Sequence, residues 1–288
     1  MSVSAGARVQ RRTSGLSDKV RKRIEITILS LPALIMFLGF VILPVFMAGY
    51  YGFFKWKGYG KPTVNGQFIG FENYKIILTD PNFQQALGHT LFVVVASLVI
   101  QGPLAILFAL LLNQRFKGRA LIRTLIFVPY VVSEVIVGTG WGLILQTTGA
   151  LNALLKKIGL GGADWISDPK IAIWTLMFII SWKYIGFAVI LMIAGMQSIP
   201  EDLYEAAKVD GAGFWRQQWS ITLPLLGPTI RIWAFMSIIG SLQLFDLVYI
   251  IWGQYVSSTA GTSTMATYMV REGRLANNYG YGSAVAVV

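Results

Sequence analysis

The sequence contains no cysteine, a single histidine and few charged residues, and each shortage excludes a class of function. Without cysteine the chain forms no disulfide and carries no thiol chemistry. With His89 as the only histidine, neither a metal site nor a histidine-based catalytic group is expected, and we predict that His89 is an interfacial residue. Charged residues make up 13% of the chain and hydrophobic residues 55%, which leaves too little polar surface for a soluble fold. These proportions predict an all-α integral membrane protein.

Long apolar runs recur along the chain. A transmembrane helix needs roughly 20 apolar residues to cross a hydrocarbon core of about 30 Å. We predict five full spans, at about residues 29–54, 87–113, 121–145, 171–196 and 221–252. A sixth run, residues 279–288, is too short to cross, and we expect an incomplete span at a truncated C-terminus. The alternative is a short re-entrant tail, which would need cover from protein.

The net charge of +11 is concentrated at the N-terminus, where we assign residues 1–26 as a basic tail, and around residues 115–123. Lys and Arg accumulate on the cytoplasmic side of membrane proteins, so both segments are predicted to be cytoplasmic and residues 55–86 to lie outside. Basic tails of this kind face anionic head groups, so we expect contact with membrane lipid and none with nucleic acid. The first apolar run has the length of a full span and no small-residue cleavage site, which indicates a retained helix and not a signal peptide.

Residues 198–220 are polar and lie between two apolar runs. The pattern Ser198-x-x-Glu201 matches a capping box at the start of a helix. We predict a short helix over residues 203–210, terminated by Gly211 in the left-handed conformation that glycine tolerates. The alternative is a solvated connector, but a connector needs no such architecture.

The same residues carry a resemblance to a known family. Glu205-Ala206-Ala207, three residues, Gly211, nine residues and then Ile221-x-Leu223-Pro224 resembles the signature of the inner-membrane permease subunits of binding-protein-dependent ABC importers. Further segments resemble the carbohydrate-uptake branch, the relatives of the maltose and glycerol-phosphate permeases: Arg123 to Tyr130, Gly149 to Leu155, Trp165 to Pro169, Tyr204 to Ala212 and Leu242 to Asp246. The resemblance covers roughly residues 31–288.

The resemblance implies a type I ABC importer transmembrane fold over residues 27–288. It also implies that residues 198–220 are the coupling helix region, which docks in a cleft of a cytoplasmic ATP-binding subunit. The residues implied for this contact are Glu201, Leu203, Glu205, Ala206, Ala207, Asp210 and Gly211.

The partners and the location also follow from the resemblance. The chain has no Gly-x-x-x-x-Gly-Lys-Ser/Thr phosphate loop, so it is not expected to be an enzyme, and ATP and Mg²⁺ would bind to separate subunits. The other implied partners are a second permease, expected to be a different chain, and an extracellular or periplasmic solute-binding protein that delivers the sugar. The complex would lie in a bacterial or archaeal cytoplasmic membrane and work by alternating access.

Alignment with these relatives implies a substrate path midway across the membrane. Its residues would be Tyr130, Lys183, Tyr184, Phe187, Ser237, Ser241 and Leu244. Aromatic faces stack on the C–H surfaces of sugars, and hydroxyl groups exchange hydrogen bonds with sugar hydroxyls. The alternative is that the aromatic residues and serines serve ordinary helix packing.

Three charged residues are predicted inside the membrane: Glu134, Lys183 and Asp246. A charge at midplane costs at least about 2.5 to 3.5 kcal/mol, so we expect all three to face the bundle interior. Either Glu134 pairs with Lys183 and fixes helix packing, or Lys183 meets an anionic or strongly hydrogen-bonding substrate and Glu134 orients it.

Two other functions are alternatives to import by an ABC complex. A secondary transporter of a polar solute should show inverted repeats and discontinuous helices. A membrane-embedded enzyme should show paired acids, serine with histidine, or metal ligands at a matched depth. The sequence indicates none of these features.

Overall fold

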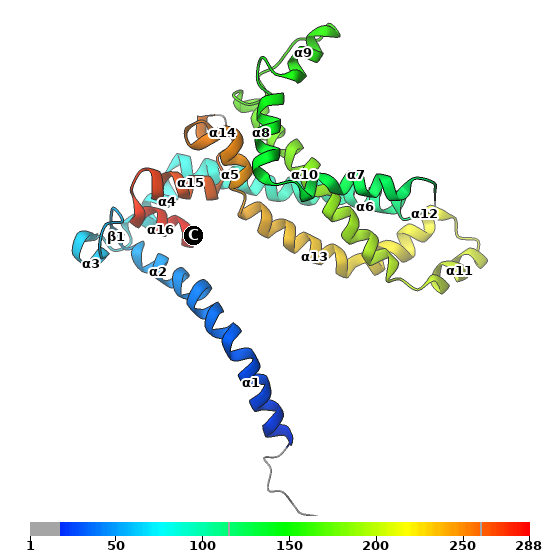
Figure 1. Ribbon diagram of the computed structural model, residues 1–288, viewed down its shortest axis with the longest axis horizontal. Coiled ribbons are helices and arrows are strands. Elements are labelled where there is room, and N and C mark those ends of the chain that lie inside the picture. Colours follow the sequence, from blue (N-terminus) through cyan, green and yellow to red (C-terminus); the bar gives the residue numbers. More distant parts are fainter. Residues whose placement is uncertain (1–17, 115, 260) are drawn as a thin grey trace, which may run out of the picture. The chain divides into compact units, whose positions relative to one another are not determined.

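The computed structural model describes three segments of the chain, residues 18–114, 116–259 and 261–288. The chain divides into an N-terminal unit and a larger second unit, with the boundary in sequence between Tyr50 and Tyr51 (Figure 1).

The N-terminal unit is one long helix. It consists of α1 (Asp18–Phe37), the π-helical turn η1 (Leu38–Ile42) and α2 (Leu43–Tyr51). The whole helix, Lys19–Tyr51, has 33 residues and is apolar enough to cross a membrane. At about 1.5 Å per residue this helix is longer than the thickness of a hydrocarbon core. It contains most of the predicted first span and begins within the segment assigned as the basic tail.

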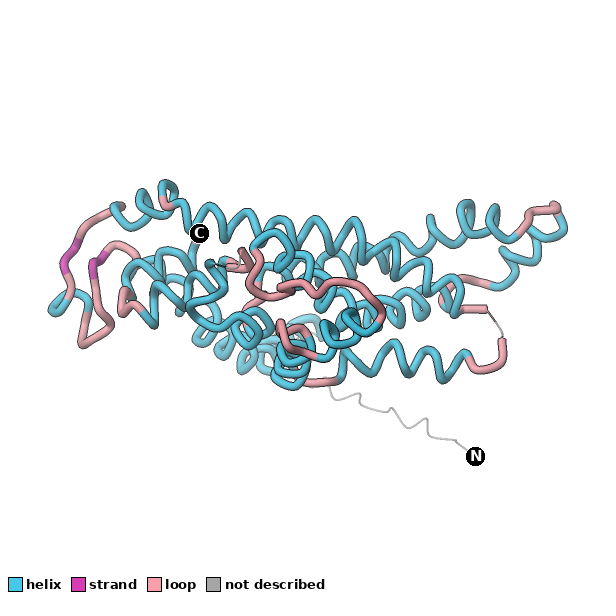
Figure 2. The backbone as a smooth tube through the Cα atoms, turned by 90° about the horizontal axis from the view of Figure 1, so that it is seen from above, coloured by secondary structure: helices cyan, strands magenta, loops and turns pink. Residues whose placement is uncertain are grey.

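The second unit begins with a small antiparallel hairpin followed by a helix. The elements are β1 (Phe54–Lys55), α3 (Pro62–Asn65), β2 (Gln67–Phe68) and α4 (Glu72–Thr79). In the hairpin Phe54 pairs with Phe68. The buried Asn73 side chain donates hydrogen bonds to the backbone oxygens of Gly52 (2.8 Å) and Phe54 (3.1 Å), which joins α4 to β1. Figure 2 shows the two strands at one end of the long helices of this unit.

The second predicted span forms a continuous helix of 32 residues, Pro81–Leu112. It consists of α5 (Pro81–Ala96), the π-helical turn η2 (Ser97–Gln101) and α6 (Gly102–Leu112). The Asp80 side chain caps it by accepting from the Asn82 backbone N–H at 2.8 Å. A π-helical turn inserts one residue into the α-helical ladder and often marks a functional site.

The third predicted span is wrong as a single helix. The structure breaks it into α7 (Arg119–Val131) and α8 (Glu134–Ile144), which are bent by 96° relative to each other. Pro129 removes one backbone donor from the last turn of α7, and Val132 and Ser133 are extended. Ser133 then caps α8, as serine commonly does at a helix start. The chain therefore contains a discontinuous helix, which the apolar run did not indicate.

The fourth predicted span is confirmed as a helix. The short α9 (Ala150–Lys157) precedes α10 (Pro169–Gln197), which has 29 residues and packs against α6, α7 and α13. α10 and α7 lie in close contact at Gly186, where a Cβ atom would overlap the backbone oxygen of Ile126. Small residues permit such close contact between membrane helices.

The polar segment and the fifth predicted span follow. Their elements are α11 (Glu201–Val209), α12 (Phe214–Gln217), η3 (Gln218–Thr222), α13 (Leu223–Leu242) and α14 (Asp246–Thr259). The helix of the fifth span begins at Phe214, earlier than predicted, because α12 continues through η3 into α13. Residues 243–245 then interrupt it before α14.

The chain ends in α15 (Met265–Val270), η4 (Arg271–Leu275) and α16 (Tyr279–Val287). The Tyr268 hydroxyl donates to Asp80, and the Tyr268 and Tyr281 hydroxyls lie 2.9 Å apart, so α15 and α16 are joined to the start of α5. Burial and the Asp80 carboxylate raise the pKa of the Tyr268 phenol above its usual range. Burial alone would raise the pKa of Asp80, but the hydrogen bonds from Tyr268, Asn82 and Tyr281 together hold it below its ordinary value.

Within the described residues, four helices are long and apolar enough to cross a membrane, or five if the bent pair α7–α8 counts as one span. The predicted count of five full spans plus an incomplete sixth therefore stays a prediction.

Candidate substrate pocket and coupling segment

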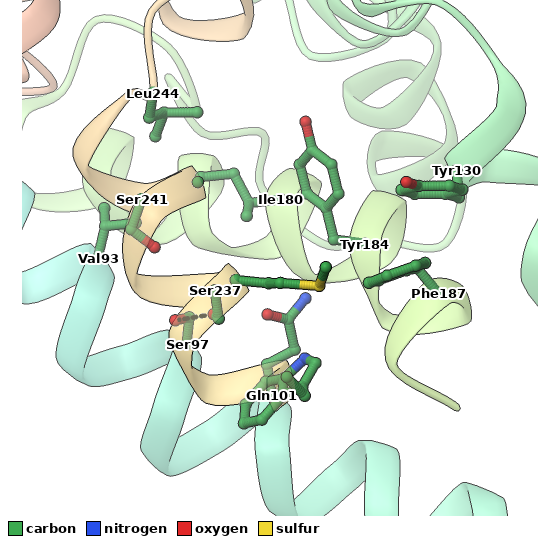
Figure 3. A pocket seen from close by; sticks show the side chains of 13 residues that line it. Val93, Ser97, Gln101, Tyr130, Ile180, Tyr184, Phe187, Ser237, Ser241 and Leu244 are labelled. Carbon is green, nitrogen blue, oxygen red and sulfur yellow. Dashed lines mark hydrogen bonds between the residues drawn. The ribbon is translucent and has the colours of Figure 1, made fainter. Parts of the chain in front are cut away.

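A pocket with a volume of about 290 Å³ lies between α5, η2, α7, α10 and α13 (Figure 3). Its walls are mainly apolar and aromatic, with a few hydroxyl and amide groups. The lining residues are Val93, Ser97, Gln101, Tyr130, Ile180, Tyr184, Phe187, Trp233, Met236, Ser237, Gly240, Ser241 and Leu244. Mostly apolar walls with a few polar groups are typical of sites that bind small molecules.

The aromatic wall is formed by α7 and α10. Tyr130 stacks on Phe187 with ring centroids 4.9 Å apart and an interplanar angle of 20°. Tyr184 meets Tyr130 edge to face at 6.2 Å. The three residues come together because Tyr130 lies in the last turns of α7, next to the helix break, while Tyr184 and Phe187 are three residues apart on one face of α10.

The polar wall is formed by η2 and α13. The hydroxyls of Ser97 and Ser237 lie 2.8 Å apart. Ser97 donates its proton to the Val94 backbone oxygen at 3.1 Å, so Ser237 is the donor in the serine pair. Gln101, four residues after Ser97, is 3% exposed, and its Nε2 atom has no hydrogen-bond partner.

Six of the seven residues predicted for the substrate path line this pocket: Tyr130, Tyr184, Phe187, Ser237, Ser241 and Leu244. Sequence reasoning missed the contribution of the second predicted span, above all Ser97 and Gln101. A signal was available, since both are polar residues within an apolar run. The contact of Trp233 and Met236 with the pocket had no comparable signal, because aromatic and Met side chains are common throughout such helices.

Lys183 does not line the pocket. It is 2% exposed, and its Nζ donates to the Val132 backbone oxygen at 2.6 Å. The same atom lies 3.7 Å from Glu134 Oε1, so the Glu134–Lys183 ion pair considered from the sequence is present. Glu134 also accepts a hydrogen bond from the Tyr184 hydroxyl. Lys183 therefore occupies the break between α7 and α8, where it pairs a carbonyl that the interrupted helix leaves free.

Asp246 is exposed in this chain, so its predicted position in the interior of the complete bundle stays a prediction. The interruption at residues 243–245 puts Asp246 in the first turn of α14, where its side chain is exposed. A carboxylate in the first turn of a helix is stabilised by the helix dipole.

The polar segment forms the predicted helix and turn. α11 ends at Val209, and Gly211 adopts φ +75°, the left-handed conformation expected from the sequence. The Gly211 N–H donates to the Lys208 oxygen (3.0 Å) and the Ala212 N–H to the Ala207 oxygen (2.8 Å), which pairs the last carbonyls of the helix.

The capping box predicted at Ser198 and Glu201 is wrong. Pro200 is the residue before the first turn, without a side-chain cap, and Glu201 is already the first helical residue. The Ser198 hydroxyl donates instead to the Gly195 oxygen at 2.7 Å, at the end of α10. α11 starts at Glu201, two residues before the start predicted at residue 203.

α11 is joined to the start of the fifth span by side-chain hydrogen bonds. Thr222 donates its hydroxyl proton to Gln218 Oε1 at 2.8 Å, so Tyr204 is the donor in the 2.9 Å contact between Tyr204 and Thr222. Gln217 Nε2 donates to the Ala212 oxygen at 2.8 Å. α11 and α13 are thus connected both through the Gly211 turn and across it.

Most of the residues predicted to contact an ATP-binding subunit are exposed in this chain. The exposed ones are Glu201, Leu203, Glu205, Ala206, Asp210 and Gly211, and Ala207 is half-buried. In Figure 1, α11 lies at the end of α13 that is farther from α14.

Comparisons with known proteins agree with this architecture. The chain is 31% identical to the trehalose/maltose transport system permease protein MalF of Thermococcus litoralis, over 90% of this chain and 86% of that protein. It is 31% identical to the arabinooligosaccharides transport system permease protein AraP of Bacillus subtilis, over 77% of this chain and 71% of that protein.

Among solved structures, the chain resembles one from a bacterial alginate ABC transporter in complex with its alginate pentasaccharide-bound periplasmic protein. The TM-score is 0.79 at 27% identity, with 93% of this chain and 90% of that chain covered. The likeness confirms the type I ABC importer transmembrane fold expected from the sequence. Residues 101–288 match the family described as binding-protein-dependent transport system inner membrane component. The chain therefore belongs to this family of multi-pass membrane permeases.

Proposed function

We propose that this chain is the membrane-spanning subunit of an ATP-driven importer that moves a carbohydrate across the cytoplasmic membrane by alternating access. The observation that carries the proposal is the connection between α11 and α13. α11 offers an exposed surface to a partner, and α13 carries Trp233, Met236, Ser237, Gly240 and Ser241 of the pocket. The names of the relatives, which are permeases for maltose, trehalose and arabinooligosaccharides, support a carbohydrate as substrate.

The connection supports a route for mechanical coupling. An ATP-binding subunit that moved α11 would pull on Thr222 through the Tyr204 hydrogen bond and on the chain through the Gly211 turn. Both connections lead into η3 and α13, so the polar wall of the pocket would move relative to the aromatic wall on α7 and α10. Alternating access requires that such a pocket open first toward one side of the membrane and then toward the other.

The proposal includes partners. ATP and Mg²⁺ bind to separate nucleotide-binding subunits, a second and different permease completes the path, and a solute-binding protein outside the membrane delivers the sugar. The N-terminus is cytoplasmic in a bacterial or archaeal membrane, which the basic residues before the first span support.

Affinity purification of the tagged chain from its own membranes tests this function. An ATP-binding subunit and a second permease should co-purify, and the reconstituted complex should accumulate sugar only when ATP and the binding protein are present. A variant of the ATP-binding subunit that cannot hydrolyse ATP is the control. Sugar uptake that is driven by an ion gradient and needs no ATP would overturn the proposal in favour of a secondary transporter.

The absence of native cysteine allows a direct test of topology. Single cysteines at Lys61 and Lys157 should react with an impermeant thiol reagent added to intact cells, and cysteines at Lys117 and Lys208 should react only after the cells are permeabilised. All four positions are exposed in this chain, so its own packing does not block the reaction. Labelling of Lys208→Cys in intact cells would overturn the cytoplasmic placement of α11.

A further inference from the structure

The pocket contains no ionised side chain among the described residues that line it. The nearest cation along α10 is Lys183, next to the pocket residue Tyr184. Its ammonium group is directed to the Val132 oxygen and to Glu134, and the residue is 2% exposed. A carboxylate or phosphate of a substrate would therefore lose water in this pocket without gaining a cation, which is costly in a low-dielectric site.

Gln101 lines the pocket and carries an amide donor without a hydrogen-bond partner. Figure 3 shows its amide end directed toward the interior, between Ser237 and Phe187. Its Nε2 is buried without a hydrogen-bond partner. A buried amide donor that finds no partner is unfavourable, and such groups in folded proteins are commonly paired by water or a ligand.

The neighbouring groups complement the amide. Ser237 uses its proton on Ser97, so its oxygen retains lone pairs that can accept, while the Gln101 amide can donate. A sugar hydroxyl both donates and accepts, so it can satisfy the two groups together. The rings of Tyr130 and Phe187, on the opposite wall, offer the apolar faces on which sugar C–H surfaces stack.

We propose that Gln101 is a specificity-determining residue whose amide hydrogen-bonds a hydroxyl group of the substrate, and that the pocket takes an uncharged carbohydrate. This rests on the proposed function, because it names the class of sugar that the same importer carries. The sequence left open whether the substrate is anionic or strongly hydrogen-bonding. This proposal favours a hydrogen-bonding substrate, and it assigns the hydrogen bond to Gln101 and not to Lys183.

The test uses the complete complex reconstituted with its binding protein. The isolated binding protein is first assayed by calorimetry against neutral sugars (maltose, trehalose, arabinobiose) and acidic ones (galacturonate, glucose 6-phosphate, an alginate oligosaccharide). ATP-dependent uptake is then measured for every sugar that binds. We expect uptake of a neutral sugar, and uptake of any acidic sugar to be at least about tenfold slower, because its charge has no partner in the pocket.

For the neutral sugar, Gln101→Leu should reduce uptake about tenfold, the equivalent of one lost hydrogen bond. Gln101→Asn should recover part of it, and binding-protein-stimulated ATP hydrolysis and the amount of assembled complex should stay unchanged. Leu104→Ala is the matched control, because Leu104 lies one turn further along the same helix and is 39% exposed.

The outcomes separate the two proposals. Unchanged uptake in Gln101→Leu would overturn the role of Gln101, and import of an acidic sugar at the rate of a neutral one would overturn the substrate class. Loss of assembly in Gln101→Leu and Gln101→Asn alike would assign Gln101 to helix packing and overturn its role in specificity. Absence of ATP-dependent uptake for every sugar would overturn the proposed function itself, and this inference with it.

Discussion

Replacing Gly211 with valine is expected to reduce uptake strongly while the chain still inserts and assembles. Gly211 has φ +75°, and the left-handed conformation costs an L-residue about 1 to 2 kcal/mol, more for a β-branched side chain. The turn would therefore rearrange, break the hydrogen bonds to the Lys208 and Ala207 oxygens, and change the path from α11 into α13. We expect uptake to fall by about tenfold or more, measured in reconstituted vesicles against the amount of complex.

Gly213 supplies a matched control two residues away. A Cβ atom added at either glycine meets no other atom within 4 Å, so bulk alone does not distinguish them. Gly213 has φ −68° and ψ 169°, which any residue adopts. Gly213→Val should therefore transport normally, and Gly211→Asn should lose less than Gly211→Val, since asparagine tolerates the left-handed region. Normal transport by Gly211→Val would show that motion does not pass through this turn.

The second large effect is expected from Lys183→Met. Without the ammonium group, the Val132 oxygen loses its hydrogen bond and the Glu134 carboxylate loses its partner inside the bundle. Removing one member of a buried ion pair typically costs about 3 to 5 kcal/mol. Because the Glu134 side chain is 28% exposed, we expect a cost near the lower end of that range, seen as a strong decrease in assembled complex on size-exclusion chromatography.

A double change with Glu134→Gln should restore part of the assembly, because it removes the unpaired charge but leaves the Val132 oxygen free. Lys170→Met is the control, since Lys170 lies in the first turn of the same helix and is exposed. If Lys183→Met and the double variant both assemble at wild-type levels and neither transports, Lys183 acts on substrate and the structural role is wrong.

The local features of the coupling segment were predictable because they depend on neighbours in sequence. A short polar stretch with carboxylates at its start and glycine at its end favours one helix with a left-handed stop, and the structure has both α11 and φ +75° at Gly211. Even here the start was misplaced, since Ser198 donates to the preceding helix and does not cap the next one. Two helices that almost adjoin compete for the same hydroxyl.

The long helices of the second and fourth spans were predictable for a similar reason. In a membrane every backbone group has to be paired within the segment, so a long apolar run favours a helix whatever surrounds it. The same reasoning failed for the third run, because a break at Val132 and Ser133 is tolerable only where another part of the chain pairs the free carbonyl. That group is Lys183, which lies 51 residues away in sequence.

The sequence by itself therefore determined the membrane class, the positions of the long apolar helices and the helix and turn around Gly211, since all of these follow from composition and short-range hydrogen bonding. Only the tertiary structure decided what the polar groups inside the helices face. It directs Lys183 to the break between α7 and α8 and Gln101 into the pocket, and it leaves Asp246 exposed at the start of α14. The physical reason is that a buried polar group takes its role from the partner it reaches, and here those partners come from helices distant in sequence.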